Sequence, residues 1–344
     1  MRRRWPAIGL WVGFVLAACG DDQPPGPGER SDALWAEFLD DNAIRAELPW
    51  LAEHQVDLYL AIHSTRIGDP ALAQLVRDAA SQRVGVRAWL LLPEADGYWP
   101  NEHNIPATRH AVLAFAQWRQ AESLPIDWIV FDLEMPLART RAVTEAIGND
   151  GQFAGIELIK QGRDPVAFAA HRAELAALID EVHALGLRAA AVTYPMVLDD
   201  AGDGDTDIED ELDVPITGID WDEASFMVYQ SLIYDFSGEW HGQEVIHSYA
   251  TTAREQWGDR AAVALGIVGT AGIDPVAMPY PDAATLAADR AAARAAGVDR
   301  VSAYSLDGVL QMPAAERAAW LDPGTPPGPL GDDIVRDFVV GLLD

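Results

Sequence analysis

The 344-residue chain has almost no cysteine or lysine. Cys19 is its single cysteine, so no disulfide can form within the chain. Lys160 is the only lysine, and 24 basic residues against 54 acidic ones give a formal net charge of −30. Such a field repels phosphate backbones, so the sequence argues against nucleic acid as a partner and favours neutral or cationic substrates. Most of these carboxylates are expected to keep an exposed surface soluble.

Several sequence motifs that are typical of particular enzyme classes are missing as well. The chain has no Gly-X-Ser-X-Gly for a serine nucleophile, no His-X-His or His-Glu-X-X-His for a metal, and no glycine-rich dinucleotide fingerprint after a strand. We therefore expect neither a catalytic metal nor a cofactor. The acidic segment Asp199–Glu211 has no glutamate at the twelfth position of a calcium loop counted from Asp203. It is predicted to be a solvated acidic loop, with a structural Ca²⁺ as the alternative.

The N-terminus carries the pattern of an export signal. Three arginines at positions 2–4 precede an almost wholly apolar run, residues 5–18, which suits a signal peptide and is short for a membrane span. The run ends in Leu-Ala-Ala-Cys, which resembles the lipobox of bacterial lipoproteins. By this resemblance residues 1–18 are removed and Cys19 carries the lipid. The alternative is an ordinary secretory signal with an accidental cysteine.

The expected domain organisation follows from composition. Residues 19–32 hold the lipidated cysteine and a polar tether rich in proline and glycine, too poor in apolar groups to pack. Residues 33–344 are predicted to form one large domain, because no second linker of this kind occurs before Pro323. The lipid would hold the exported domain at the bacterial cell envelope, and the outer membrane is favoured over the inner.

Short runs of β-branched and aromatic residues alternate with longer helical segments along residues 33–344. Eight such repeats predict an α/β fold closed into a (β/α)8 barrel, and a doubly wound open sheet is the alternative. The expected strands are Ala33–Leu39, Val56–His63, Val86–Pro93, Trp128–Glu134, Arg188–Tyr194, Ser225–Tyr229, Ala262–Val268 and Arg300–Ser305. The expected helices include Ala43–His54, Ala71–Gln82, Thr108–Ala121, Pro165–Leu185, Glu211–Ile219, Glu244–Trp257, Ala283–Ala296, Ala314–Leu321 and Asp333–Leu343.

Asp132 and Glu134 stand out at the end of the fourth expected strand. Residues two apart on a strand share a face, so both carboxylates should point into the barrel mouth, where barrel enzymes place their chemistry. Two carboxylates there lose water and repel each other, which should raise one pKa and create a general acid. The alternative is a structural pair held in salt bridges by Arg139 and Arg141.

The fourth strand, Asp-Trp-Ile-Val-Phe-Asp-Leu-Glu, resembles the Asp-Gly-X-Asp-X-Asp-X-Glu signature of glycoside hydrolase family 18, the chitinase-like barrels. Asp127, Asp132 and Glu134 match the first Asp, the last Asp and the Glu, whereas Val130 replaces the middle Asp. Two further segments match in order. Met-Val-Tyr-Gln at residues 227–230 resembles the family's Met-X-Tyr-Asp, and Tyr-Ser-Leu-Asp at residues 304–307 resembles its Trp-Ser-X-Asp.

The resemblance implies roles for these residues. Glu134 would protonate the glycosidic oxygen, Asp132 would support the substrate's own N-acetyl group as it attacks, and Tyr229 would hydrogen-bond that acetamide. Gln230, Tyr304 and Asp307 would contact substrate. Because Val130 and Gln230 replace acids of the family motif, the resemblance leaves chitin itself open as the substrate.

Sugar rings stack on aromatic faces, and Tyr98 and Trp99 lie in the long loop after the third strand. They are predicted to bind glycan, with a loop folded on its own aromatic cluster as the alternative. Two functions remain open. One is a glycosidase acting on an N-acetylhexosamine-containing glycan; the other is a non-catalytic glycan-binding lipoprotein on the same barrel. Glu134 favours the enzyme, whereas Val130 and Gln230 favour the binder.

Overall fold

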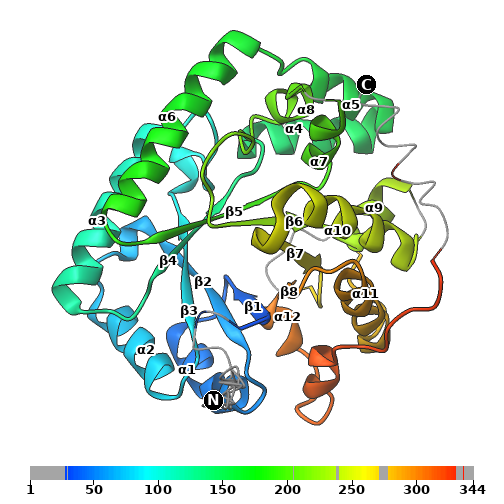
Figure 1. The fold of residues 1–344 in the computed structure, drawn as a ribbon. Helices are drawn as coiled ribbons and strands as arrows, with labels where there is room; N and C mark the ends of the chain where they lie inside the picture. Colours follow the sequence, from blue (N-terminus) through cyan, green and yellow to red (C-terminus); the bar gives the residue numbers. More distant parts are fainter. Residues whose placement is uncertain are drawn as a thin grey trace, which may run out of the picture.

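A computed structural model describes residue 28 and residues 30–203, 205–237, 240–270, 278–330 and 336. Within them, eight parallel strands close into a barrel in sequence order and helices surround it (Figure 1). The predicted (β/α)8 fold is therefore confirmed. Cys19 lies outside the described residues, as does the stretch Asp333–Leu343 apart from Arg336. The strands are β1 Asp32–Ala36, β2 Asp57–His63, β3 Val86–Leu91, β4 Trp128–Asp132, β5 Arg188–Thr193, β6 Glu223–Met227, β7 Ala261–Gly266 and β8 Arg300–Tyr304.

The helices between the strands include several that the sequence pattern did not indicate, among them α4, α5 and α9. The α-helices are α1 Asp41–Glu53, α2 Pro70–Ser81, α3 Ile105–Glu122, α4 Leu137–Asp150, α5 Gln152–Lys160, α6 Pro165–Ala184, α7 Val197–Asp203, α8 Asp207–Glu211, α9 Gln230–Ser237, α10 Gln243–Trp257, α11 Ala283–Ala295 and α12 Leu306–Val309. Short 3-10 helices are η1 Ser64–Arg66, η2 Glu94–Asp96, η3 Gly258–Arg260 and η4 Arg317–Leu321.

The helix predicted at Glu211–Ile219 is wrong, because α8 ends at Glu211, where that helix was expected to begin. Asp213 has a positive φ of 60°, and Pro215 keeps Val214 before it out of the helical region. The segment Ala314–Leu321 is also only partly helical, since η4 covers Arg317–Leu321.

The prediction of a solvated acidic loop at Asp199–Glu211 is wrong for its described part. Asp200, Glu209, Asp210 and Glu211 are buried. Asp200 accepts hydrogen bonds from the backbone N–H groups of Ile208 and Glu209, at 2.9 and 2.8 Å. Glu209 accepts from the N–H groups of residues 216 and 217. Asp200 and Glu209 thus satisfy backbone N–H groups at the start of α8 and in the segment that follows it, so they are structural groups.

Two apolar cores hold the barrel. The larger one lies between the strands and the surrounding helices, and the smaller one fills the inside of the barrel. The inner core contains Val130, which is fully buried, and a cluster of rings in which Trp35 stacks on Tyr59 at 4.3 Å and meets Trp89 edge-on at 4.9 Å. Inward-pointing residues of alternate strands pack in layers, so the barrel has a solid centre below its mouth.

The amino-terminal end of the barrel, here called the floor, buries a network of charged groups. Glu223 of β6 is inaccessible to solvent and binds Arg87 Nη1 at 2.8 Å, Arg300 Nη1 at 2.7 Å and the Tyr59 hydroxyl at 3.0 Å. The carbonyl of Gly28 accepts a hydrogen bond from Arg87 at 3.0 Å, so part of the expected tether is docked on this floor.

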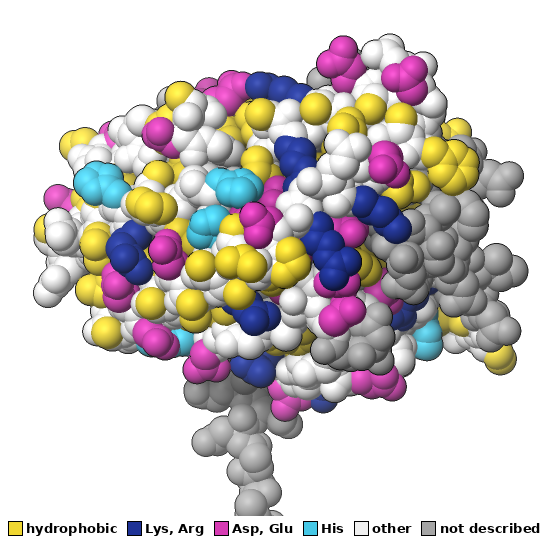
Figure 2. All heavy atoms as spheres, turned by 90° about the horizontal axis from the view of Figure 1, so that it is seen from above, with side chains coloured by type: hydrophobic (Ala, Val, Ile, Leu, Met, Phe, Trp, Pro, Cys, Tyr) yellow, Lys and Arg dark blue, Asp and Glu magenta, His cyan; other side chains and the backbone are white. Residues whose placement is uncertain are grey.

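The described surface shows no single concentration of charge on the face drawn in Figure 2. Acidic, basic and apolar side chains are interspersed over that face. No helix among the described residues is both long enough and apolar enough to cross a membrane.

Candidate active site at the barrel mouth

The carboxyl ends of the strands carry the two acids that the sequence singled out. Asp132 is the last residue of β4 and is buried, and Glu134 follows two residues later and is partly buried. The Leu133 N–H still donates to Val192 O of β5 at 2.7 Å, so the strand direction continues past Asp132. Leu133 faces the outer core, and both acids therefore face the mouth.

Glu37 is a third carboxylate at this mouth, and it was not predicted from the sequence. It follows β1 and lies two residues after Trp35, which points into the barrel. The alternation of Trp35 inside and Ala36 outside was a signal that could have indicated Glu37, because acids at strand ends face the mouth. Glu37 accepts hydrogen bonds from the hydroxyl groups of Tyr98, at 2.5 Å, and Tyr304.

Tyrosines from four different loops or strand ends surround these acids. The Tyr194 hydroxyl donates to Glu134 Oε2 at 3.3 Å. The rings of Tyr229 and Tyr304 lie nearly parallel with centroids 6.2 Å apart. The Tyr229 hydroxyl makes no hydrogen bond to the described residues, although the charges of Asp132, Glu134 and Glu37 all act on it. The hydroxyl thus lies within the electrostatic influence of the three acids and has no hydrogen-bond partner among the described residues.

The turn at Gly97 and Tyr98 sets the position of the Tyr98 ring. Both residues have positive φ, 106° and 67°, and the turn brings Tyr98 O within 2.7 Å of the Leu92 N–H. A left-handed backbone costs a tyrosine about 1–2 kcal/mol. The hydrogen bond to Glu37 and the edge-on contact with Trp99, at 5.4 Å, offset that cost.

No basic side chain neutralises the carboxylates of the mouth among the described residues. Burial raises the pKa of Glu134 to about 7, with the charge of Glu37 adding to it. Burial also raises the pKa of Asp132 well above its ordinary value, and the charges of Glu134 and Glu37 raise it further. The pair therefore carries a proton near neutral pH.

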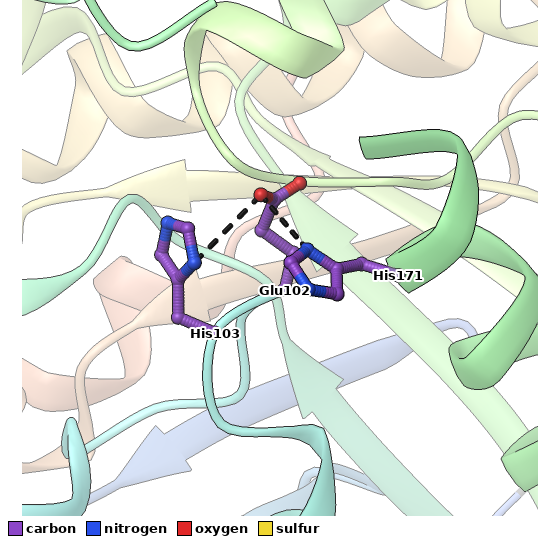
Figure 3. Close-up of side chains that lie close together, drawn as sticks. All are labelled: Glu102, His103 and His171. Carbon is purple, nitrogen blue, oxygen red and sulfur yellow. Dashed lines mark hydrogen bonds and ion pairs between the residues drawn. The ribbon is translucent and has the colours of Figure 1, made fainter. Parts of the chain in front are cut away.

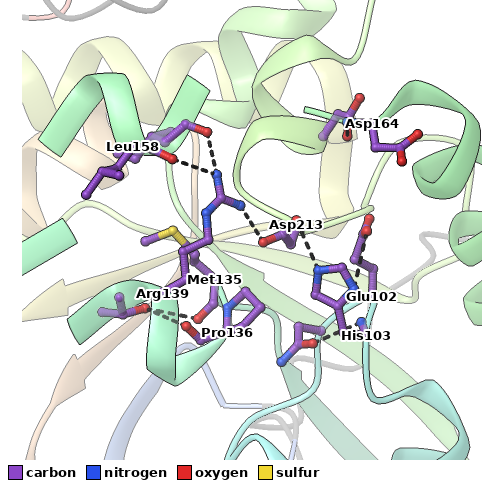
Figure 4. Close-up of polar contacts among 12 residues, drawn as sticks. Glu102, His103, Met135, Pro136, Arg139, Leu158, Asp164 and Asp213 are labelled. Atoms are coloured by element: carbon purple, nitrogen blue, oxygen red, sulfur yellow. Dashed lines mark hydrogen bonds and ion pairs between the residues drawn. The ribbon is translucent and has the colours of Figure 1, made fainter. Parts of the chain in front are cut away.

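The arginines proposed as structural partners pair elsewhere. Arg139 of α4 binds Asp213 through Nη1 at 2.5 Å and also donates to the backbone carbonyls of residues 158 and 159 (Figure 4). Arg141 binds Glu94 at the surface. The salt-bridge alternative for Asp132 and Glu134 is therefore wrong.

Three other predicted site residues form hydrogen bonds within the protein. Gln230 is buried, and its Nε2 donates to Gly242 O and Asp289 Oδ2, each at 2.8 Å. Asp307 accepts from the backbone N–H groups of Glu37 and Phe38, at 3.1 and 2.8 Å. Trp99 is half-buried, and its indole donates to Met135 O at 2.9 Å. Asp307 and Trp99 thus position the loops that carry Glu37 and Glu134.

The mouth carboxylates do not gather as a metal-binding group. Among the described residues, the one group of three ligand-type side chains is Glu102, His103 and His171, on a loop and a helix outside the barrel.

Comparison with known proteins supports the fold alone. No family model and no curated protein matches the chain. Among solved structures, it is similar to a chitinase from Chromobacterium violaceum, with a TM-score of 0.51 and 14% identity over 86% of this chain and 98% of that one. A class V chitinase from Pseudomonas fluorescens gives a TM-score of 0.47 and 13% identity over 86% and 99% of the two chains. A family 1 β-glucosidase from Thermotoga maritima gives 0.48 and 10% over 77% of each. These likenesses share the TIM barrel.

Proposed function

We propose that the barrel mouth hydrolyses glycosides, with Glu134 as the general acid. The observation that carries the proposal is the Asp132–Glu134 pair, in which Asp132 is buried and Glu134 partly buried, and which has no cationic partner among the described residues. A carboxyl group with a pKa near 7 can donate a proton at neutral pH and accept it back. A second supporting fact is its place at the carboxyl ends of the strands, where barrel enzymes carry their chemistry.

The proposed reaction is a substrate-assisted cleavage. Glu134 donates its proton to the glycosidic oxygen as the bond from that oxygen to the anomeric carbon breaks. The carbonyl oxygen of the substrate's 2-acetamido group then forms the new bond to that carbon, and Asp132 stabilises the positive charge that develops on the acetamide. The Tyr229 hydroxyl hydrogen-bonds the acetamide oxygen. Water, deprotonated by Glu134, opens the intermediate with retained configuration.

Glu37 extends the proposed site beyond the family motif. Its two tyrosine partners hold the rings of Tyr98 and Tyr304 at the mouth. Its negative charge also raises the pKa of Glu134. We therefore assign Glu37 a positioning role, because it acts on the substrate through the tyrosines and on the acid through its field.

A glycan binder without catalysis is the second candidate. Val130 favours it, because this side chain lies in the apolar inner core where the family motif has an acid. The buried Gln230 amide, already bound to Asp289, favours it too. The binder explains less well why an uncompensated pair of carboxyl groups is kept at the mouth.

Turnover by the purified full chain separates the two candidates. Aryl N-acetylhexosaminides, chitin oligosaccharides and peptidoglycan fragments are offered in one panel, and released phenol or reducing ends are measured. The glycosidase proposal expects cleavage of at least one N-acetylated substrate and none of its non-acetylated counterpart. Binding without cleavage of every substrate would establish the binder instead.

We also propose that the protein is anchored to the cell envelope by a lipid on Cys19, with the outer membrane as its location. Support comes from the sequence pattern of residues 1–19. Metabolic labelling with a fatty acid should mark the wild-type chain and leave Cys19→Ser unlabelled. Equal labelling of the two chains would contradict the anchor.

A further inference from the structure

A second group of titratable side chains lies outside the barrel mouth, where the loop before α3 meets α6. Glu102 and His103 come from the loop and His171 from the helix, and Figure 3 shows both imidazoles turned toward one carboxylate oxygen. Glu102 Oε1 lies 3.1 Å from His171 Nδ1 and 3.8 Å from His103 Nδ1. One ligand atom from each of the three lies within 4.8 Å of the other two.

We propose that Glu102, His103 and His171 bind one Zn²⁺ ion, with a fourth coordination position open to solvent. Ligand atoms at about 2.0–2.1 Å in a tetrahedron lie about 3.3 Å from one another. The contact between Glu102 and His171 is already near that value. The side chain of His103 is 54% exposed, so a small rotation can bring its Nδ1 closer to Glu102.

The donor set selects the metal. Two imidazoles with one carboxylate suit zinc and related transition metals, whereas Ca²⁺ and Mg²⁺ take oxygen ligands throughout. The side chains also provide an entry path, because the His103 and His171 rings reach the surface while Glu102 is only 3% exposed.

An unpartnered oxygen of Glu102 is a second and independent observation. Its Oε2 is buried and has no hydrogen-bond partner among the described residues. A buried carboxylate oxygen left without a partner costs free energy, so such atoms are normally satisfied. A cation bound through both oxygens of this carboxylate would remove that cost.

The surroundings of His103 match those of a zinc-bound histidine. Its Nε2 lies 3.4 Å from Asp213 Oδ1, and Arg139 holds Asp213 in place (Figure 4). A carboxylate on the far nitrogen keeps the proton there and leaves the Nδ1 lone pair for a metal. Asp213 is itself buried, so its position is well determined.

Zinc binding by the purified full chain, expressed without a histidine tag, tests the proposal. After a chelator has removed bound metal, Zn²⁺ is titrated against a chromophoric indicator, and Co²⁺ is added separately to read its visible d–d absorption. One equivalent of Zn²⁺ and a tetrahedral Co²⁺ spectrum are expected. Asp213→Asn should raise the Kd for zinc by about 10–100-fold, and His171→Ala should raise it by more than that.

A matched control exists on the same helix. His183 of α6 is 31% exposed and bound to Asp222, whereas His171 is 30% exposed and bound to Glu102. His183→Ala should therefore leave the zinc Kd unchanged. His103→Ala adds a variant whose exposed side chain can be removed without disturbing the fold. Zinc binding below one equivalent in the wild type, or equal Kd values in His103→Ala, His171→Ala and His183→Ala, would overturn the proposal.

Discussion

The floor and the mouth of the barrel both bury carboxylates, but they treat them in opposite ways. On the floor, burial alone would raise the pKa of Glu223, yet the charges of Arg87 and Arg300 and its hydrogen bonds hold it below the ordinary value. At the mouth, burial and the charge of Glu37 raise the pKa of Glu134, and burial and the charges of Glu134 and Glu37 raise the pKa of Asp132.

The difference between the two ends lies in their partners. Each oxygen of Glu223 meets a guanidinium, so the group stays ionised and ties strands β3, β6 and β8 together. The mouth carboxylates have tyrosine hydroxyls and one another instead, so they keep a proton that chemistry can use. The burial of a carboxyl group therefore does not show by itself whether the group is structural or reactive. The presence or absence of a neighbouring cation distinguishes the two cases.

The largest expected effect is on catalysis at the mouth. Glu134→Gln keeps the side-chain shape and removes the proton donor, so kcat on a cleaved glycoside should fall by about 10²–10⁴-fold while substrate binding survives. The alkaline limb of the pH–rate profile should disappear with it. Glu94→Gln is the control, because Glu94 is an exposed acid paired with Arg141. A full rate in Glu134→Gln and a loss in Glu94→Gln would move the acid to Glu94.

The corresponding change on the floor should affect stability rather than rate. Glu223→Gln leaves Arg87 and Arg300 without their buried counter-charge, which should lower the free energy of unfolding by about 3–5 kcal/mol. Chemical denaturation measures this loss, and kcat of the folded fraction should be unchanged. Asp259→Asn removes an exposed partner of Arg254 and should cost less than about 1 kcal/mol. Equal losses of unfolding free energy in Glu223→Gln and Asp259→Asn would contradict a larger stabilising role for the buried ion pairs of the floor.

The two ends should also differ in the sign of their pH dependence. The folded pKa of Glu134, about 7, exceeds its ordinary value of 4.5, so its contribution to stability is complete below pH 4.5 and is lost as the pH rises through 7. Glu134→Gln should therefore match the wild type in Tm at pH 4.5 and exceed it at pH 8.5. The contribution of Glu223 is present above pH 4.5 and is lost on acidification. A Tm difference for Glu134→Gln that is constant across this range would contradict the raised pKa.

The smallest expected effect concerns the aromatic loop at the mouth. Trp99→Ala removes a half-buried ring beside Tyr98 and should weaken oligosaccharide binding by about 1 kcal/mol, or roughly fivefold in Kd. Isothermal titration calorimetry measures the change. Phe153→Ala removes a ring that is 73% exposed on α5 and should leave the affinity unchanged. An unaltered Kd in Trp99→Ala would make this loop a structural cluster only.

The pattern of residues along the chain was enough to predict the barrel and one carboxylate pair. Both follow from local periodicity: strand and helix patterns repeat along the chain, and residues 132 and 134 share a face wherever that strand lies. The end of helix α8 was not predicted correctly. Residues 211–219 looked helical by composition, but a positive φ at Asp213 and the proline at 215 ended the helix.

Contacts between residues that are far apart in the chain could not be predicted in this way. Glu37 binds a tyrosine 267 residues away, and Glu102, in a loop, meets a histidine of α6 that is 69 residues away. The folded chain also buries Asp200 and Glu209, which bind backbone N–H groups of α8 and of the segment after it. The physical reason is common to all three. Burial, hydrogen bonding and charge depend on neighbours in space, and a linear pattern records neighbours along the chain only.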